Sequence, residues 1–414
     1  MRPIIKNIIQ DTFWVVVLQG FNYLIPLFVW PYLMVVLGAE GFGVVGFSMA
    51  FIQFMMLIVD FGFNLSATKR IATASSQEET DQISSNTIIA KLILLAASIV
   101  LSIIIILLPQ FAPYRISVIC LMPMLCSSVI SMQWLYQGLG KIRKLWVMNS
   151  ICKLIIIPLT FVAVKGAKDV LIAVGIQSAA YFVSALVGFI WALRTGMFSF
   201  VSVAKQKIQN AFSDSFPLFI STATSSVYAM LLVVILGYFA TTQEVGVYSA
   251  VEKIMRVSCY ALLIPALQVC YPQISKMSNE DSSAAMRFVK WLSMAMISTM
   301  LIIGCILFFY GVDIMHLLGK DYSGAENIFR IMAFIPALVA ISGIYGQLDL
   351  LAMGKEKQKR QFRNVYTAGA SLAMILVLVS IPNLTAAKTA YILLITEAVV
   401  ATGMGVFAMM RKKA

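Results

Sequence analysis

Apolar runs of about twenty residues, the length an α-helix needs to cross the roughly 30 Å hydrocarbon core of a bilayer, recur along this chain. They extend from residue 13 to residue 410 and are separated only by short polar breaks. Of the 414 residues, 60% are hydrophobic and only 12% are charged, whereas soluble domains carry roughly a quarter charged residues. The chain therefore cannot form a water-soluble fold, and we predict an all-α integral membrane protein.

We expect about twelve transmembrane helices joined by short loops, because each apolar run is long enough for one crossing. The predicted spans are 11–37, 43–66, 86–108, 114–138, 145–164, 170–193, 215–240, 246–272, 287–310, 328–352, 364–382 and 388–410.

The basic residues predict the orientation of these helices. Most Lys and Arg residues fall in the loops and tails of one side, and the loops of the other side hold only Arg115, Lys165, Lys168, Lys320 and Lys388. Basic loops are retained in the cytoplasm during insertion. We therefore predict a multi-pass protein of the bacterial inner membrane with both termini in the cytoplasm. The first apolar run lacks the cleavage site of a removable signal peptide, so we expect its helix to be retained.

The same loops explain the net charge of +13 without nucleic acid as a partner, because a nucleic-acid-binding protein gathers its charge on a solvated face. Six cysteines fall inside apolar spans and show no metal-binding spacing, so we expect no metal site, cofactor or disulfide framework.

A weak internal repeat suggests two halves. A proline, a glutamine and a glycine followed by lysine recur a little over 200 residues apart, at Pro123, Gln133 and Gly140 and again at Pro336, Gln347 and Gly354. We predict two parallel six-helix bundles, residues 1–205 and 206–414, around a central cavity.

Three cations lie inside predicted spans, where a charge at the bilayer centre costs at least about 2.5–3.5 kcal/mol and normally faces a cavity or a partner. Lys153 lies in the middle of its span, whereas Lys253 and Arg256 share one face of the 246–272 helix. We expect Lys153 and Lys253 to have no local acid. These cations predict a positively charged cavity that binds a phosphate or pyrophosphate group.

Two acids lie close to basic residues along the chain. Glu252 lies one helical turn before Arg256 and is positioned to neutralise it, which would be a purely structural role. Asp60 precedes Lys69 and Arg70 by two to three turns, and we predict an ion pair or gate among these three residues.

Three further ionisable residues lie within predicted spans. We expect Lys91, near the end of its predicted span, to extend to the lipid headgroups. Asp349 and Glu397 are candidates for proton coupling. Alternatively, these acids are hydrogen bonded and stabilise helix packing.

Several motifs together resemble the Wzx-type O-antigen or polysaccharide flippases of the multidrug/oligosaccharidyl-lipid/polysaccharide exporter superfamily. The resemblance covers nearly the whole chain. The motifs are LGAEGFG at 37–43, DFG at 60–62 followed by KR at 69–70, QWLYQG at 133–138, GVY at 246–248 followed by EKI at 252–254, and GKDY at 319–322 followed by Ala325.

The resemblance implies a flippase that moves undecaprenyl-pyrophosphate-linked oligosaccharide from the cytoplasmic to the periplasmic leaflet by alternating access through a cation-lined cavity. Implied partners are that lipid-linked glycan and the membrane lipids, and polysaccharide polymerase machinery is a further candidate. The resemblance also implies a role in O-antigen and lipopolysaccharide biosynthesis.

Two other functions compete with this prediction. An ion-coupled drug/cation antiporter of the same superfamily would be expected to have a cavity dominated by acids rather than by lysine and arginine. A membrane glycan polymerase would need a large outer loop for a catalytic site, and the largest candidate, residues 311–327, is short and has no paired carboxylates. We therefore predict that the protein is not an enzyme.

Overall fold

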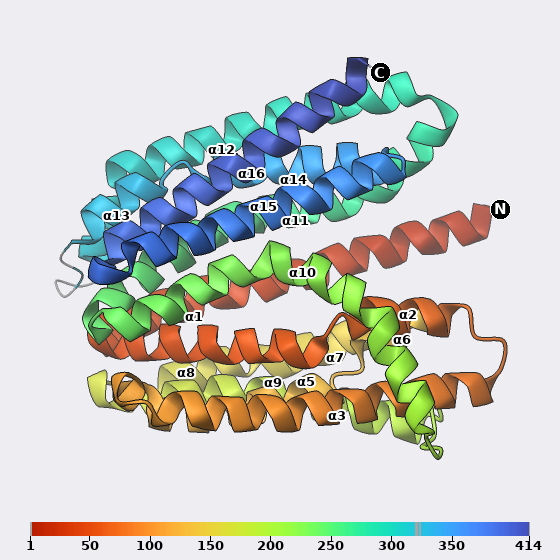
Figure 1. Cartoon of the computed structure of the whole chain (residues 1–414), viewed down its shortest axis with the longest axis horizontal. Coiled ribbons are helices and arrows are strands. Elements are labelled where there is room, and N and C mark those ends of the chain that lie inside the picture. The colour runs from red at the N-terminus through yellow and green to blue at the C-terminus, as the bar shows by residue number, and fades with distance from the viewer. Residues whose placement is uncertain (1, 319–321, 323, 414) are drawn as a thin grey trace. The chain divides into compact units, whose positions relative to one another are not determined.

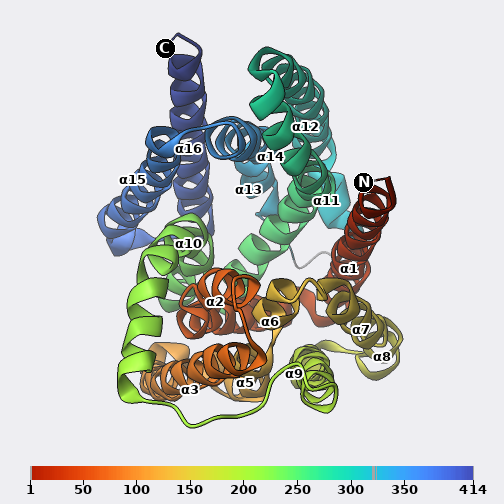
Figure 2. The same cartoon turned by 90° about the vertical axis from the view of Figure 1, so that its right-hand side faces the viewer.

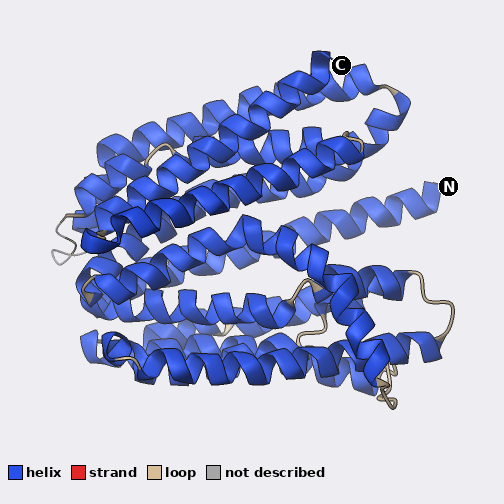
Figure 3. Cartoon of the chain, in the orientation of Figure 1, coloured by secondary structure: helices blue, strands red, loops and turns tan. Residues whose placement is uncertain are grey.

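The computed structural model describes residues 2–318, 322 and 324–413, and within them every regular element is a helix (Figures 1 and 3). The helices are α1 (Arg2–Asp60), α2 (Phe63–Ala72), α3 (Gln77–Leu107), η1 (Pro109–Tyr114), α4 (Arg115–Cys120), α5 (Met122–Ile130), α6 (Gln133–Gly138), α7 (Ile142–Leu154), α8 (Ile156–Ala163), η2 (Ala167–Asp169), α9 (Val170–Arg194), α10 (Lys205–Phe239), α11 (Thr242–Glu280), α12 (Ser282–Leu318), α13 (Ala325–Met332), α14 (Ile335–Gly343), η3 (Ile344–Ala352), α15 (Glu356–Ser380), η4 (Ile381–Asn383) and α16 (Ala386–Lys413). The predicted all-α class is confirmed.

The described residues contain nine helices that are long and apolar enough to cross a membrane. A tenth is counted if the pair Pro109–Cys120 and Met122–Gly138, bent by 50°, forms one broken span. The layout of twelve spans in two repeats stays a prediction. Helix α1 covers the first predicted span and most of the second, ending at Asp60, and it breaks between them at Gly38, whose φ of 67° and ψ of 178° are not helical.

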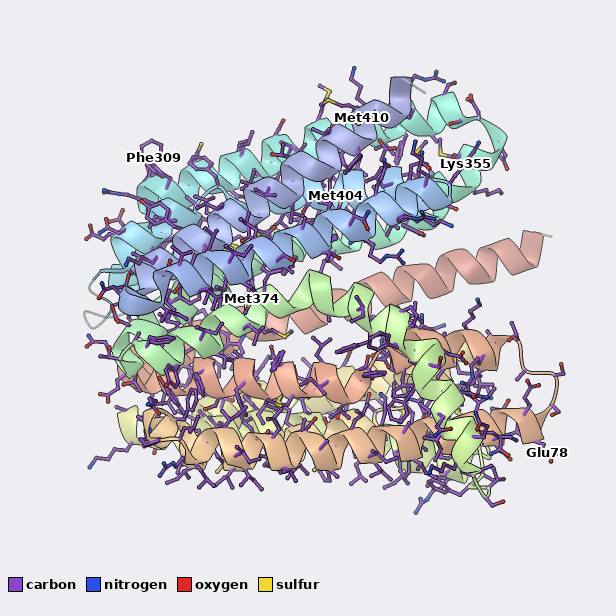
Figure 4. The ribbon with its side chains drawn as sticks, in the orientation of Figure 1. Glu78, Phe309, Lys355, Met374, Met404 and Met410 are labelled. Atoms are coloured by element: carbon purple, nitrogen blue, oxygen red, sulfur yellow. The ribbon has the colours of Figure 1, made fainter. Side chains whose placement is uncertain are left out.

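The outer surface of the helices is apolar, as a lipid-facing surface must be. Figure 4 labels Phe309 on α12, whose side chain is 71% exposed, and Met404 on α16, which is fully buried. Other large apolar side chains, such as Val379 at 75%, are equally exposed. In a soluble protein so much exposed apolar surface would cause aggregation, whereas in a bilayer it contacts acyl chains.

The helices form two compact units, which differ from the predicted division at residue 205. Unit 1 contains residues 1–43 and 235–414, and unit 2 contains residues 44–234. Figure 2 shows unit 2 end on, with α3, α5 and α9 in one layer and α2, α6 and α7 in the next. In unit 1, α11, α12, α14 and η3 enclose an apolar core that includes Leu263, Met300 and Ile344.

The first part of α1 joins unit 1 because two glycines allow its backbone to touch α11. A β-carbon built on Gly43 would overlap the carbonyl oxygen of Thr242, and one built on Gly246 would overlap that of Ala39. Small residues allow such close helix contacts in membranes. The Tyr322 hydroxyl also donates a hydrogen bond of 2.9 Å to the carbonyl of Met34. Sequence spacing alone cannot reveal these contacts.

Replacing Gly43 with alanine is expected to destabilise the protein by about 1–3 kcal/mol, because the added methyl group forces α1 away from α11. Thermal unfolding of the detergent-solubilised protein measures the effect. Gly405 on α16 is the matched control, since a β-carbon there meets nothing within 4 Å. Equal melting temperatures for the Gly43→Ala and Gly405→Ala variants would contradict the close contact.

Candidate functional site

A polar cavity of about 410 Å³ lies within unit 2. Its walls come from α1, α2, α3, α5, α6, α7, α9 and α10, and its volume falls within the roughly 300–1,000 Å³ range of small-molecule pockets. Its polar and ionisable lining residues are Gln53, Asp60, Asn64, Lys91, Ser127, Ser128, Ser131, Gln133, Asn149, Tyr181 and Ser184. Polar groups are costly inside a membrane protein and normally mark a functional site.

The charges in this cavity form a pair. Lys91 Nζ donates a hydrogen bond of 2.9 Å to Asp60 Oδ1 and another of 3.3 Å to the carbonyl of Ser128, near the end of α5. Lys91 is 1% exposed. A buried cation requires such partners, and the carbonyls at a helix C-terminus favour positive charge.

The predicted ion pair of Asp60 with Lys69 and Arg70 is wrong. The chain leaves the helix directly after Asp60, at Phe61 with a φ of 45° and Gly62 with a φ of 77°. Helical spacing therefore does not extend from Asp60 to the two basic residues. Lys69 is exposed, and Arg70 Nη1 instead lies 3.7 Å from Asp214 Oδ2.

The predicted headgroup contact of Lys91 is also wrong. Helix α3 begins at Gln77, nine residues before residue 86, where the predicted span began. The Ser76 hydroxyl accepts a hydrogen bond of 3.1 Å from the backbone N–H of Glu79 and caps this early start. Lys91 consequently lies fourteen residues into the helix, roughly 21 Å from its start at 1.5 Å per residue.

Neutral polar side chains complete the cavity. The Ser184 hydroxyl on α9 donates a hydrogen bond of 2.6 Å to the Asn149 Oδ1 atom on α7. This contact occupies the amide oxygen and leaves the amide N–H₂ group to donate. Ser131 lies at the break between α5 and α6, where the chain is extended instead of helical.

A second cluster of charges lies in unit 1, on α11. Arg256 Nε donates a hydrogen bond to Glu252 Oε1, which confirms the local pair expected from their i, i+4 spacing. The Nζ atom of Lys253 lies 5.6 Å from the centre of the Trp30 ring, a cation–π distance. Both cationic side chains remain partly exposed, at 27% for Arg256 and 19% for Lys253.

The expectation that Lys253 has no local acid is wrong. Its Nζ atom lies 3.7 Å from Glu252 Oε2, although adjacent residues on a helix do not normally face each other. The long lysine side chain bridges that difference. This distance exceeds that of a hydrogen bond, so Glu252 is bound more closely to Arg256 than to Lys253.

The other predicted site residues lie elsewhere. The side chain of Lys153 lies outside the described part of the structure. Asp349 is fully buried in η3, a π-helix, and Glu397 is 8% exposed on α16. Glu397 and Arg256 line the same small cavity in unit 1. Within the described residues, no group of three or more His, Cys, Asp or Glu side chains could hold a metal ion.

Sequence reasoning missed the cavity of unit 2. One signal was present in α3, where the buried residues Ser84, Thr87 and Lys91 follow the i, i+3, i+7 spacing of one helix face. A buried polar face on a membrane-spanning helix indicates a polar neighbour, and of these three residues Lys91 lines the cavity. The pairing of Asn149 with Ser184 had no comparable signal, because the two residues lie on separate helices.

The sequence is similar to those of known proteins. Residues 8–278 match the family model described as "Polysaccharide biosynthesis protein". The "Putative O-antigen transporter" of Escherichia coli (strain K12) is 29% identical over 372 residues, which cover 89% of this chain and 88% of that protein. A protein of the same name from Shigella dysenteriae is 30% identical over 363 residues, 86% of this chain and 89% of that protein.

Solved structures share the fold at low sequence identity. The lipid II flippase MurJ, in an inward closed conformation, has a TM-score of 0.74 at 14% identity, and the match covers 96% of this chain and 87% of that chain. An inward-facing multidrug resistance MATE family transporter of the MOP superfamily has a TM-score of 0.71 at 13% identity. That match covers 95% of this chain and 94% of that chain.

Proposed function

Because this chain belongs to the polysaccharide biosynthesis protein family, we propose that it is a Wzx-type flippase of the MOP superfamily and moves a lipid-linked glycan between the leaflets of a membrane. The names of its relatives as O-antigen transporters support this function, and they describe transport instead of catalysis.

The observation that carries the proposal is the cluster of Glu252, Lys253 and Arg256 on α11. Two cations share one carboxylate there, within a helix that is apolar enough to cross a membrane. Glu252 is closest to Arg256, so Lys253 is the cation best able to bind a further anion. A partly dehydrated cation attracts phosphate strongly, because water screens it less.

The proposed substrate is an undecaprenyl-pyrophosphate-linked oligosaccharide of the O-antigen type. It moves from the cytoplasmic to the periplasmic leaflet of the bacterial inner membrane by alternating access. Both termini lie in the cytoplasm in this proposal. Lys253 and Arg256 bind the pyrophosphate group, and Lys153 is a further candidate cation for the substrate. Asp349 and Glu397 are the candidates for proton coupling, because both carboxyl groups are buried. Burial disfavours the charged form of a carboxyl group, so a change in its surroundings during transport can make it take up or release a proton.

Deletion of the gene is expected to abolish surface polysaccharide and to leave lipid-linked repeat units on the cytoplasmic side. The cell cannot polymerise units that do not reach the periplasm. The measurement combines staining of surface polysaccharide with the accessibility of the lipid-linked sugar to an impermeant enzyme added to spheroplasts. Expression of the intact chain from a plasmid should restore both.

A normal amount of surface polysaccharide in the deletion strain would contradict the proposed function. A changed drug susceptibility together with intact polysaccharide would instead favour the drug/cation antiporter.

A further inference from the structure

We propose that the polar cavity of unit 2 binds the uncharged sugar part of the substrate, separately from the cations that bind its phosphates. This inference rests on the proposed function and specifies the ligand of a second site. The cavity lies wholly within residues 44–234, whereas Lys253 and Arg256 belong to unit 1. The two sites therefore come from different parts of the chain and differ in their chemistry.

The cavity has no net charge. Among the described residues that line the cavity, the carboxylate is that of Asp60 and the cation is that of Lys91. They are joined at 2.9 Å, so their charges cancel. A phosphate that enters the cavity loses its bound water, and a cavity without net charge provides no attraction to offset that cost. An uncharged ligand enters without that penalty.

The cavity wall supplies hydrogen-bond donors and acceptors that suit a sugar. Four amide side chains line the cavity, those of Gln53, Asn64, Gln133 and Asn149. Each amide both donates and accepts, and a sugar hydroxyl does the same. Tyr181 contributes a ring and a hydroxyl, and the methionine and leucine side chains of the wall provide apolar surface. Sugars likewise combine hydroxyl groups with apolar C–H faces.

The Asn149 side chain is held in place before any ligand binds. The hydrogen bond of 2.6 Å from Ser184 holds the Asn149 oxygen, so the amide donates with a fixed orientation. Ser184 itself is 4% exposed. A fixed donor lowers the entropy cost of binding. At Ser131 the chain leaves the helix between α5 and α6, and membrane transporters often interrupt helices at their binding sites.

The test compares two lipids on the full-length protein in nanodiscs. One is the undecaprenyl-pyrophosphate-linked repeat unit extracted from cells that lack this flippase, and the other is sugar-free undecaprenyl pyrophosphate. Microscale thermophoresis measures both dissociation constants. We expect the wild-type protein to bind the glycosylated lipid about tenfold more tightly, the effect of one or two additional hydrogen bonds. Asn149→Ala should remove this preference and leave binding of the sugar-free lipid unchanged.

Two further variants separate sugar binding from structural damage. Ser184→Ala should reduce the preference less than Asn149→Ala does, because the amide remains but loses its orientation. Ser178→Ala is the matched control on the same helix, since the Ser178 hydroxyl accepts the backbone N–H of Met124 and does not line the cavity. It should keep the full preference even if the melting temperature falls.

Equal affinity of the wild-type protein for the two lipids would overturn the sugar site and leave the proposed function intact. An unchanged preference in Asn149→Ala, or an equal loss for both lipids, would overturn it as well. If the wild-type protein bound neither lipid, both the proposed function and this inference would fail.

Discussion

Asp60→Asn is expected to destabilise the protein by about 3–5 kcal/mol, the cost of removing one partner from a buried ion pair. Lys91 is only 1% exposed, and its other acceptor is a single backbone carbonyl. An asparagine can still accept a hydrogen bond but cannot balance the charge. The thermal unfolding temperature in detergent and the yield of monodisperse protein measure this effect.

Two variants make the expected result specific. Adding Lys91→Met to Asp60→Asn should recover most of the lost stability, because no buried charge is then left without its partner. Asp214→Asn is the matched control, since its ion pair with Arg70 is far more exposed, with Asp214 at 59%. Exposed ion pairs contribute about 0–1 kcal/mol to the free energy of unfolding. If Asp60→Asn lost no more stability than Asp214→Asn, the buried charge of Lys91 would not need Asp60 to balance it.

Lys253→Gln is expected to lower the transport of lipid-linked glycan about tenfold or more. A hydrogen bond to a charged group contributes about 1.5–3 kcal/mol, and about 1.4 kcal/mol corresponds to a factor of ten. Lys253→Arg keeps the charge and should retain most of the activity. The assay reconstitutes the full-length protein in liposomes and follows the accessibility of the lipid-linked sugar to an added enzyme.

Lys276→Gln is the control for this substitution, because Lys276 is an exposed lysine on the same helix. It should transport at the wild-type rate. Arg256→Gln is less informative, since it would leave the buried Glu252 without its closest partner. Full transport by a normally folded Lys253→Gln variant would reject phosphate binding at Lys253 without affecting the case for a flippase.

The candidate site could be predicted from the sequence only where the contact is local. The pair of Glu252 and Arg256 follows from i, i+4 spacing on one helix, and the structure confirms it. The same reasoning failed for Asp60, because the helix ends immediately after it. Its true partner, Lys91, is 31 residues away on another helix.

The sequence by itself determined that this chain is a membrane protein made of helices. Hydrocarbon provides no hydrogen bonds, so each apolar run must satisfy its backbone within its own helix, and this requirement can be recognised from hydropathy alone. Only the tertiary structure decided which helices meet. It brought Ser184 to Asn149, joined residues 1–43 to the C-terminal helices and enclosed the polar cavity of unit 2. These contacts depend on how helix surfaces fit one another, and that fit has no periodicity along the sequence.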